Sequence, residues 1–234
     1  MGYLEQFTKK MIDTENKIGY VFKNKALLKN ALTHRSFRST NPKIKSNERI
    51  EFLGDAVLEL VVTEVLYQDY PNYNEGELTK IRSALVRTEM LNQVMKQKKI
   101  NENIFLSVGE RKSGGREKGY ILANVYESIV GAIYLDGGFV NAQKFINSTI
   151  LHRVKNVINN KTYIDPKTHL QEISQSKYKQ IPLYRIVGSQ GLEHEKVFTA
   201  EVSLNGKIIA TGKGLTKQRA EEQCAKKALK ILKK

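Results

Sequence analysis

The sequence predicts a two-domain protein in which an all-α domain is followed by a small α+β domain with the order α-β-β-β-α. Three observations lead to this fold class. Apolar residues recur at helical spacings of three and four up to about residue 155, strand signals are scarce before residue 180, and a polar stretch separates the two patterns. With 234 residues, the chain is long enough for two separate cores.

The first part of the chain contains four clear helical patterns, over residues 25–35, 47–67, 77–87 and 121–135. The sequence becomes polar around Asn159, and Asp165-Pro166 then suits a helix N-cap followed by a first-turn proline. We therefore expect one domain over residues 1–158, a linker over residues 159–164 and a second domain over residues 165–234.

The second part should begin with a short helix over residues 167–178, followed by strands at 183–188, 196–204 and 207–212. Asn205-Gly206 joins the last two strands and is a dipeptide that tight hairpin turns favour. A basic helix over residues 216–232 ends the chain. Cys224 lies between alanines at helical spacing in this helix, which predicts a buried small apolar residue.

The composition indicates a polyanionic partner. The formal net charge is +15 and the pI is near 9.7, so the chain should attract nucleic acid, with an anionic membrane surface as the competing interpretation. Residues 1–160 carry 24 Lys and Arg against 17 Asp and Glu, and residues 161–234 carry 15 against 7, so the second part is the denser in positive charge.

Other bulk features point to a cytoplasmic protein. No apolar run is long enough to span a bilayer, and the first residues lack the apolar stretch of a secretory signal. Cys224 is the only cysteine, so we expect no disulfide within the chain.

The strongest chemical signal is an acidic stripe in the helix predicted at 47–67. Glu48, Glu51, Asp55 and Glu59 fall on one side of it, while apolar residues occupy nearly every other direction. Like charges at these spacings repel by roughly 0.2–0.5 kcal/mol per pair even when exposed, and burial increases that cost. A hard divalent cation would neutralise them. The alternative is a solvated acidic face.

A second polar face occurs in the helix predicted at 121–135. Asn124 and Glu127 point the same way, while Ser128 and Gly131 leave room for close approach of another backbone or a ligand. On spacing alone, these residues are as consistent with packing or solvation as with catalysis. Glu75, just before the next predicted helix, is a further acidic candidate, whose simpler interpretation is a favourable charge at a helix amino terminus.

These segments resemble the ribonuclease III family. NERIEFLGDAVL at 47–58 is similar to the signature of that family, EGELTKIRSALV at 75–86 to its next helix, and ILANVYESIVGAIYLD at 121–136 to its second acidic helix. The part from about Asp165 onwards resembles a double-stranded RNA-binding domain. The resemblance covers almost the whole chain and implies an all-α endonuclease domain followed by an RNA-binding domain.

The resemblance also implies roles for individual residues. The implied metal ligands are Glu51, Asp55, Asn124 and Glu127, with Asp55 and Glu127 as catalytic residues and Glu48 and Glu75 as further acidic positions. Phe52 matches an aromatic residue that inserts into the partner subunit, which implies a homodimer, whereas the sequence alone would place it in the core. The segment 33–37 resembles a family segment near the RNA and equally suits an ordinary helix end.

One position departs from the family pattern. The family usually has aspartate where this chain has Asn124, so a charged ligand becomes a neutral amide. Three explanations are open: a tolerated natural variant, a weakened or inactive enzyme, or a deliberate substitution. The presence of Glu51, Asp55 and Glu127 favours the first.

In the second domain, the resemblance implies recognition of duplex RNA by shape, through phosphates and 2′-hydroxyl groups. The implied contacts are made by Gln171, Glu172, His194, Thr216, Lys217 and Arg219. Thr216 should cap the last helix, whose start offers N–H groups to an anion. Many members of the family have a second lysine where this chain has Gln218.

The implied function is hydrolysis of double-stranded RNA with Mg²⁺, or Mn²⁺ in its place, leaving 5′-phosphate and 3′-hydroxyl ends with short 3′ overhangs. A role in processing ribosomal RNA precursors and other RNAs, including messenger RNA, follows from resemblance alone. We expect no membrane partner and no small-molecule cofactor. Two alternatives are a double-stranded RNA-binding protein of the same fold with weakened catalysis, and a helical DNA-binding regulator with a basic domain.

Overall fold

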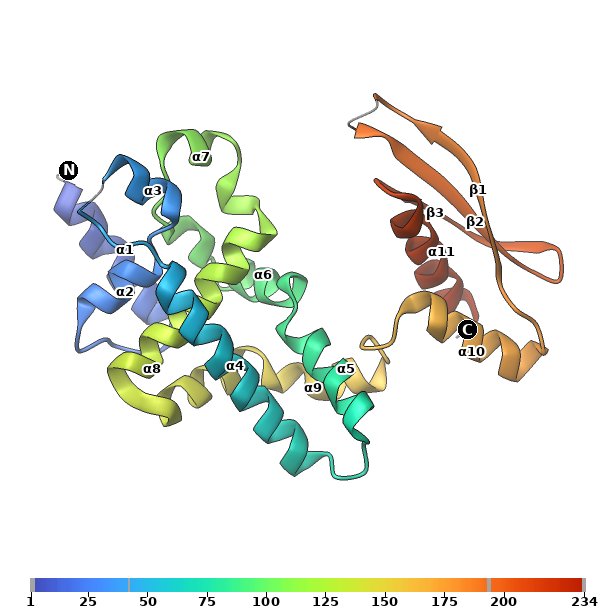
Figure 1. Ribbon diagram of the computed structural model, residues 1–234, viewed down its shortest axis with the longest axis horizontal. Helices are drawn as coiled ribbons and strands as arrows, with labels where there is room; N and C mark the ends of the chain where they lie inside the picture. Colours follow the sequence, from blue (N-terminus) through green and yellow to red (C-terminus); the bar gives the residue numbers. More distant parts are fainter. Residues whose placement is uncertain (1–2, 42, 193–194, 233–234) are drawn as a thin grey trace. The chain divides into compact units, whose positions relative to one another are not determined.

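The computed structural model describes residues 3–41, 43–192 and 195–232, and the chain divides into two compact units between Asn159 and Asn160 (Figure 1). The first unit is helical. The second combines two helices with a three-stranded antiparallel sheet, so the predicted fold class is confirmed. Within the described ranges, no helix is both long and apolar enough to cross a membrane.

The helices of the first unit are arranged around two of them, α4 (Glu48–Asp69) and α8 (Gly119–Thr149). The others are α1 (Tyr3–Ile18), α2 (Lys25–Ala31), α3 (Arg35–Thr40), α5 (Glu75–Val86), α6 (Thr88–Gln97), α7 (Val108–Lys112) and α9 (Val154–Asn159), with short 3₁₀ turns at Ile100–Asn103, Gly115–Glu117 and Leu151–Arg153. The most extensive helix contact in the unit joins α4 and α8 (Figure 1). Buried side chains of both helices form the core at this contact.

Two glycines bring α4 and α8 to backbone contact. A Cβ atom added to Gly54 would overlap the carbonyl group of Glu127, and one added to Gly131 would overlap the carbonyl oxygen of Ile50. A side chain at either position would force the helices apart, because protein interiors have no space to absorb such an overlap. The room that Gly131 leaves is therefore filled by the backbone of α4.

The predicted helix over residues 25–35 is wrong as a single element. It breaks after Ala31, and Thr33 pairs with Phe105 in an isolated parallel bridge. The N–H of Phe105 donates to the carbonyl oxygen of Leu32 at 2.9 Å, and the N–H of His34 donates to the carbonyl oxygen of Phe105 at 3.1 Å. His34 then caps the new helix α3. A long-range backbone pairing thus overrides the local apolar pattern.

The second unit follows the predicted order. It contains α10 (Pro166–Tyr178), β1 (Leu183–Gln190), β2 (Val197–Leu204), β3 (Lys207–Gly214) and α11 (Lys217–Leu232), with strand order β1-β2-β3. Asp165 caps α10 by accepting hydrogen bonds from the N–H groups of Lys167 and Thr168 at 2.9 and 3.1 Å. Asn205 and Gly206 both have positive φ angles, 51° and 73°, as the predicted hairpin turn requires.

Small residues allow α11 to lie close against the sheet. Cys224 is fully buried, as predicted, and its thiol donates to the carbonyl oxygen of Ala200 at 2.8 Å. A Cβ atom on Gly212 would overlap the backbone of α11 at Ala220. The buried core consists of Leu170, Ala200, Val202, Ala210, Ala220, Cys224, Ala225, Ala228 and Leu229.

Candidate catalytic site and RNA-binding surface

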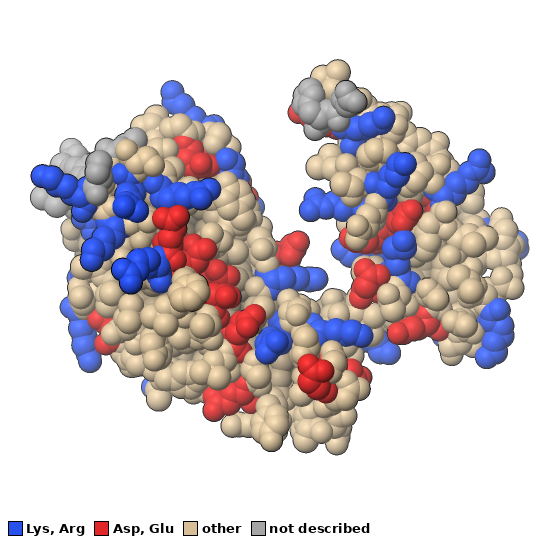
Figure 2. Space-filling model, viewed as in Figure 1, with Lys and Arg blue, Asp and Glu red and all other residues tan. Residues whose placement is uncertain are grey.

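The predicted acidic residues lie where α4 faces α8. Glu48, Glu51 and Asp55 follow one stripe of α4 at spacings of three and four, and Glu127 lies on α8. Glu51 and Glu127 are half-buried, whereas Glu48 and Asp55 are exposed. A band of acidic side chains crosses this face of the first unit over α4 (Figure 2). The α4–α8 contact therefore brings carboxylates from distant parts of the sequence together.

Glu127 is the most perturbed of these acids. Burial raises its pKa to about 8, and the neighbouring charges of Asp55 and Glu51 add to the rise. A carboxyl group with such a pKa holds its proton at neutral pH until a cation compensates the negative charge around it.

The surroundings of Glu51 change the pKa of its carboxyl group in both directions. Burial raises its pKa, a hydrogen bond with the side chain of Asn124 lowers it, and the charge of Glu48 raises it. Smaller contributions come from Arg35, which lowers the pKa, and from Asp55, which raises it. The residues predicted as a metal site therefore interact with one another, with Asn124 among them.

Glu48, Glu51, Asp55 and Glu127 form the acidic group of this unit. Their carboxylate oxygens are suitable ligands for a divalent cation. Glu51, Asp55 and Glu127 form no ion pair within the described part of the chain, and hard cations prefer oxygen ligands of this kind. The side chains are not gathered into a finished coordination shell, because no three His, Cys, Asp or Glu residues of the described ranges are placed to hold a metal ion together. The group supplies the charge and the ligands for a cation, and its side chains would have to converge on binding.

Two neighbours of the acidic group were not assigned a role from the sequence. Arg35, the first residue of α3, is close enough to act electrostatically on Glu51, which gives the segment 33–37 a place beside the acids. Ser46 is buried, and its hydroxyl donates to Oε2 of Glu48 at 2.7 Å. The similarity of segment 33–37 to the family was a signal for Arg35, whereas nothing in the sequence pairs Ser46 with a carboxylate.

Glu75 does not join the acidic group within the chain. It is the exposed first residue of α5, and its carboxylate accepts a hydrogen bond from the hydroxyl of Thr79 at 3.1 Å. It is not among the charges that perturb Glu51 or Glu127. Asn74 and Glu77 form a reciprocal capping box at the start of α5. Glu75 therefore has the helix-terminus setting that its sequence context predicted.

Phe52 is 83% exposed, so the expectation from the sequence alone, a core residue, is wrong. It lies on the opposite side of α4 from the buried core. At the carboxyl-terminal end of the same helix is a cavity of about 800 Å³. Its lining residues come from α4, α5 and the turn between them: Thr63, Leu66, Tyr67, Gln68, Tyr70, Pro71, Tyr73, Glu75, Leu78, Thr79 and Arg82.

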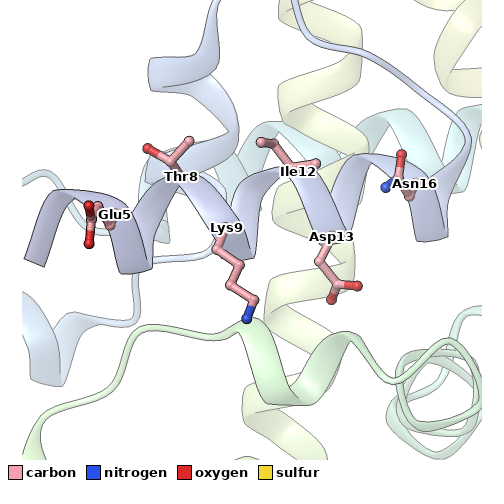
Figure 3. Close-up of a pocket in the computed structure, with 6 residues that line it drawn as sticks. All are labelled: Glu5, Thr8, Lys9, Ile12, Asp13 and Asn16. Carbon is pink, nitrogen blue, oxygen red and sulfur yellow. The ribbon is translucent and has the colours of Figure 1, made fainter. Parts of the chain in front are cut away.

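A second hollow, of about 580 Å³, lies along α1 (Figure 3). It is lined by residues of this one helix, Glu5, Thr8, Lys9, Ile12, Asp13 and Asn16. None of the residues predicted for catalysis, metal binding or RNA binding contributes to it.

The predicted RNA-binding residues of the second unit are on its surface. Gln171 and Glu172 are exposed on α10, and Lys217 and Arg219 are exposed in the first turn of α11. The hydroxyl of Thr216 accepts a hydrogen bond from the N–H of Arg219 at 3.1 Å, so Thr216 caps α11 as predicted. His194 lies outside the described residues. The amino terminus of α11, with its exposed Lys217 and Arg219, is therefore a positively charged position at which a phosphate could bind.

Comparisons with known proteins agree with this arrangement. Residues 24–154 match the family described as Ribonuclease-III-like, and residues 166–232 match the double-stranded RNA binding motif. The chain is 40% identical to Ribonuclease 3 of Pseudothermotoga lettingae, over 95% of this chain and 96% of that protein. It is 41% identical to Ribonuclease 3 of Nitratiruptor sp., over 96% of this chain and 98% of that protein.

A solved structure also resembles the first unit. It is the nuclease domain of ribonuclease III from Campylobacter jejuni, described as having structural flexibility in a region involved in dimer formation. The match has a TM-score of 0.55 and 41% sequence identity, and it covers 58% of this chain and 96% of that domain.

Proposed function

This chain belongs to the ribonuclease III family, and we propose that it hydrolyses double-stranded RNA with a divalent cation held by Glu51, Asp55, Asn124 and Glu127. The family and the RNA-binding motif identify an endoribonuclease acting on double-stranded RNA. The group of carboxylates on α4 and α8, which forms no ion pair in the described chain, carries the proposal of a metal. Mg²⁺ is the proposed ion, with Mn²⁺ able to replace it.

The proposed reaction breaks the bond between phosphorus and the 3′ oxygen. Water adds to phosphorus in line with that bond, its proton is lost, and the leaving oxygen is protonated, which gives 5′-phosphate and 3′-hydroxyl ends. A bound divalent cation supplies acidity to water and charge compensation to the phosphate. Asp55 and Glu127 place carboxyl groups on two facing helices, and the side chain of Asn124 on α8 acts on Glu51 of α4. Arg35 adds a positive charge that an approaching phosphate could meet.

A homodimer is supported by a continuous exposed stripe along α4. Phe52, Ala56, Leu60, Thr63 and Tyr67 follow one another at spacings of three and four, and all five are exposed. An exposed stripe in which four of the five residues are apolar is typical of an interaction surface. The stripe begins at Phe52 and ends at the cavity that Tyr67 lines.

A two-fold axis through the middle of this stripe would join the phenylalanine of each copy to the cavity of the other. Two-fold interfaces use the same patch on both copies, so one protruding side chain and one cavity suffice for both halves of the contact. Glu75 lines the cavity and would then lie beside the acidic group of the second copy. This arrangement would give Glu75 the place in the acidic surface that it lacks within one chain. Two sites in one dimer would also account for cuts in both strands and short 3′ overhangs.

The second unit supplies the affinity for the duplex. Its exposed Gln171, Glu172, Lys217 and Arg219 suit contacts with 2′-hydroxyl groups and phosphates. If the 2′-hydroxyl contributes as proposed, duplex DNA should compete poorly with duplex RNA. Equal competition would favour the DNA-binding alternative. We place the activity in the cytoplasm and in the processing of ribosomal RNA precursors and other transcripts.

The proposal is tested by cleavage of an end-labelled RNA duplex with Mg²⁺, with and without a chelator. We expect metal-dependent cutting by the chain and loss of cutting in Glu127→Gln. The matched control is Glu102→Gln, which removes an exposed glutamate of the same unit outside the acidic group and should cut normally. Binding without cutting, with activity appearing only in Asn124→Asp, would instead favour the weakened RNA-binding protein.

The dimer is tested by sedimentation equilibrium. The parent chain should sediment at twice its chain mass of 26.7 kDa, and Phe52→Ala should shift the population towards monomer. Val108→Ala removes another exposed apolar side chain, outside the α4 stripe, and should leave the mass unchanged. A parent chain that sediments as a monomer at all concentrations would disprove the proposed interface.

A further inference from the structure

His34 is a buried histidine at the start of α3, and its hydrogen bonds connect α3 to the segment before α7. Its Nδ1 atom accepts a hydrogen bond from the backbone N–H of Ser36 at 3.3 Å and lies 2.9 Å from the hydroxyl oxygen of Ser36. That oxygen accepts a hydrogen bond from the N–H of Ser107 at 3.2 Å. The backbone N–H of His34 donates to the carbonyl oxygen of Phe105 at 3.1 Å, so side chain and backbone both join the two segments.

These contacts determine which ring nitrogen of His34 carries the proton. The N–H of Ser36 can only donate, so Nδ1 has no proton and is the acceptor. The hydroxyl of Ser36 accepts from Ser107 and therefore has its own hydrogen available for the same nitrogen. The neutral imidazole must then carry its proton on Nε2. A second proton can enter only at Nδ1, so the charged form of His34 cannot cap the N–H of Ser36.

The same hydrogen bonds hold Arg35 beside the start of the acidic group. Arg35 follows His34 and is the exposed first residue of α3. On the other side of His34, the carbonyl oxygen of Thr33 accepts a hydrogen bond from the N–H of Asn47 at 2.9 Å, and Asn47 directly precedes Glu48. Helix α3 has only six residues, so it depends on its cap and its neighbours for stability. Loss of the cap should therefore release Arg35.

The guanidinium group of Arg35 is available to a ligand. It forms no ion pair within the described residues. A guanidinium binds phosphate best through two parallel hydrogen bonds, which require a defined direction of the side chain. The contribution of Arg35 to RNA binding should therefore depend on how firmly α3 is held.

The surroundings of His34 favour its neutral form. Burial lowers its pKa from the usual 6.5. Four charges from the surrounding elements largely offset one another, because Glu110 of α7 and Glu48 of α4 raise the pKa, whereas Arg35 of α3 and Lys118 before α8 lower it. Glu110 and Lys118 also form an ion pair at 2.7 Å. His34 is therefore neutral at pH 7 and takes up a proton only in mild acid.

We propose that His34 is a positioning residue of the nuclease: its neutral form holds Arg35 beside the acidic group, where the guanidinium binds a phosphate of the RNA, and its protonated form releases Arg35. The inference rests on the proposed function and deepens it. His34 acts through Arg35 and does not itself need to touch the RNA.

The first test is a double-mutant cycle on the affinity for duplex RNA, measured in chelator at pH 7.5. His34→Ala should weaken binding about tenfold, as loss of a hydrogen-bonded charged contact would do. In the Arg35→Ala background the same substitution should change the affinity less than about twofold, because the contact that it disturbs is already absent. The matched control is His152→Asn, which replaces an exposed histidine of the same unit and should bind as the parent chain does.

The second test uses His34→Asn, which keeps a strong cap without a titratable group. At pH 7.5 this variant should bind duplex RNA as the parent chain does. As pH falls from 6.5 towards 5, the parent should lose affinity relative to His34→Asn, because only the parent takes up a proton at position 34. Nitrogen-15 NMR of the parent at pH 7.5 should show the His34 proton on Nε2, with the signals assigned by their absence from His34→Asn.

Three results would overturn the inference. A proton on Nδ1 at pH 7.5 would contradict the hydrogen bonds that carry it. Equal loss of affinity from His34→Ala with and without Arg35 would show that His34 does not act through Arg35. An affinity ratio between the parent and His34→Asn that does not change with pH would exclude release by protonation. In each case metal-dependent cutting by the parent chain would leave the proposed function standing, whereas a parent that binds as expected and does not cut would remove the proposed function alone.

Discussion

Glu127 should make the metal-free nuclease unit less stable as pH rises, and Glu127→Gln should remove that effect. The folded protein raises the pKa of this carboxyl group from 4.5 to about 8. The folded state therefore binds the proton more tightly than the unfolded state does. Relative to Glu127→Gln, the free energy of unfolding should fall as pH rises from 4.5 to about 8 and stay constant above that range.

The magnitude follows from the displacement of the pKa. Each pKa unit corresponds to about 1.4 kcal/mol, so a fully shielded group would lose about 5 kcal/mol. Glu127 is only half-buried, and solvent screening reduces the loss to about 2 kcal/mol. For a unit of this size, 1 kcal/mol shifts the melting temperature by about 2–4 °C, so the variant should melt about 4–8 °C higher at pH 9.

Differential scanning calorimetry in chelator, from pH 5 to pH 9, measures this difference directly. The second unit is the internal reference, because its transition should not respond to the substitution. Glu102→Gln controls for removal of an exposed charge and should show no pH-dependent gap. A gap between parent and Glu127→Gln that stays constant across this range, or that narrows with rising pH, would refute the reasoning.

Three further predictions concern other parts of the chain. Gly54→Ala should destabilise the first unit by about 3 kcal/mol in urea unfolding, because its Cβ atom would overlap the backbone of α8, and an unchanged midpoint would contradict that contact. Lys217→Ala should reduce the salt dependence of duplex RNA binding by about one unit of slope, whereas an unchanged slope would remove Lys217 from the interface. Cys224 should not react with a thiol reagent at pH 8 until the second unit unfolds, because it is buried and burial raises the pKa of its thiol. Rapid reaction of the native protein would contradict this burial.

Local signals predicted the second unit well. Asp165 with its following proline marked the start of α10, and Asn205-Gly206 marked the hairpin between β2 and β3. In both cases a few adjacent residues determine the backbone conformation, so the helix start and the hairpin turn can be predicted from a short stretch of sequence. The helical character of the first unit was predictable for the same reason, since apolar spacing is a property of each helix by itself.

The failures in the first unit have non-local causes. The break between α2 and α3 depends on the pairing of Thr33 with Phe105, which lies 72 residues further along the chain. Phe52 was assigned to the core because its helix is apolar on most sides, yet its side chain is exposed in the described structure. The acidic group likewise depends on the contact between α4 and α8. Spacing identified acidic faces on two helices and was only a weak indication that they meet, which the resemblance to a family strengthened.

Because α4 and α8 touch through glycines, the spacing of the acidic residues does not depend on which side chains fill the core. The distance between Asp55 and Glu127 depends on two main chains that touch at Gly54 and Gly131, rather than on the size of packed side chains. Apolar substitutions elsewhere in the unit can change stability while Asp55 and Glu127 keep their separation. The activity of the nuclease should therefore tolerate changes in core composition, and, apart from the acidic residues themselves, it should be most sensitive to substitution at Gly54 and Gly131.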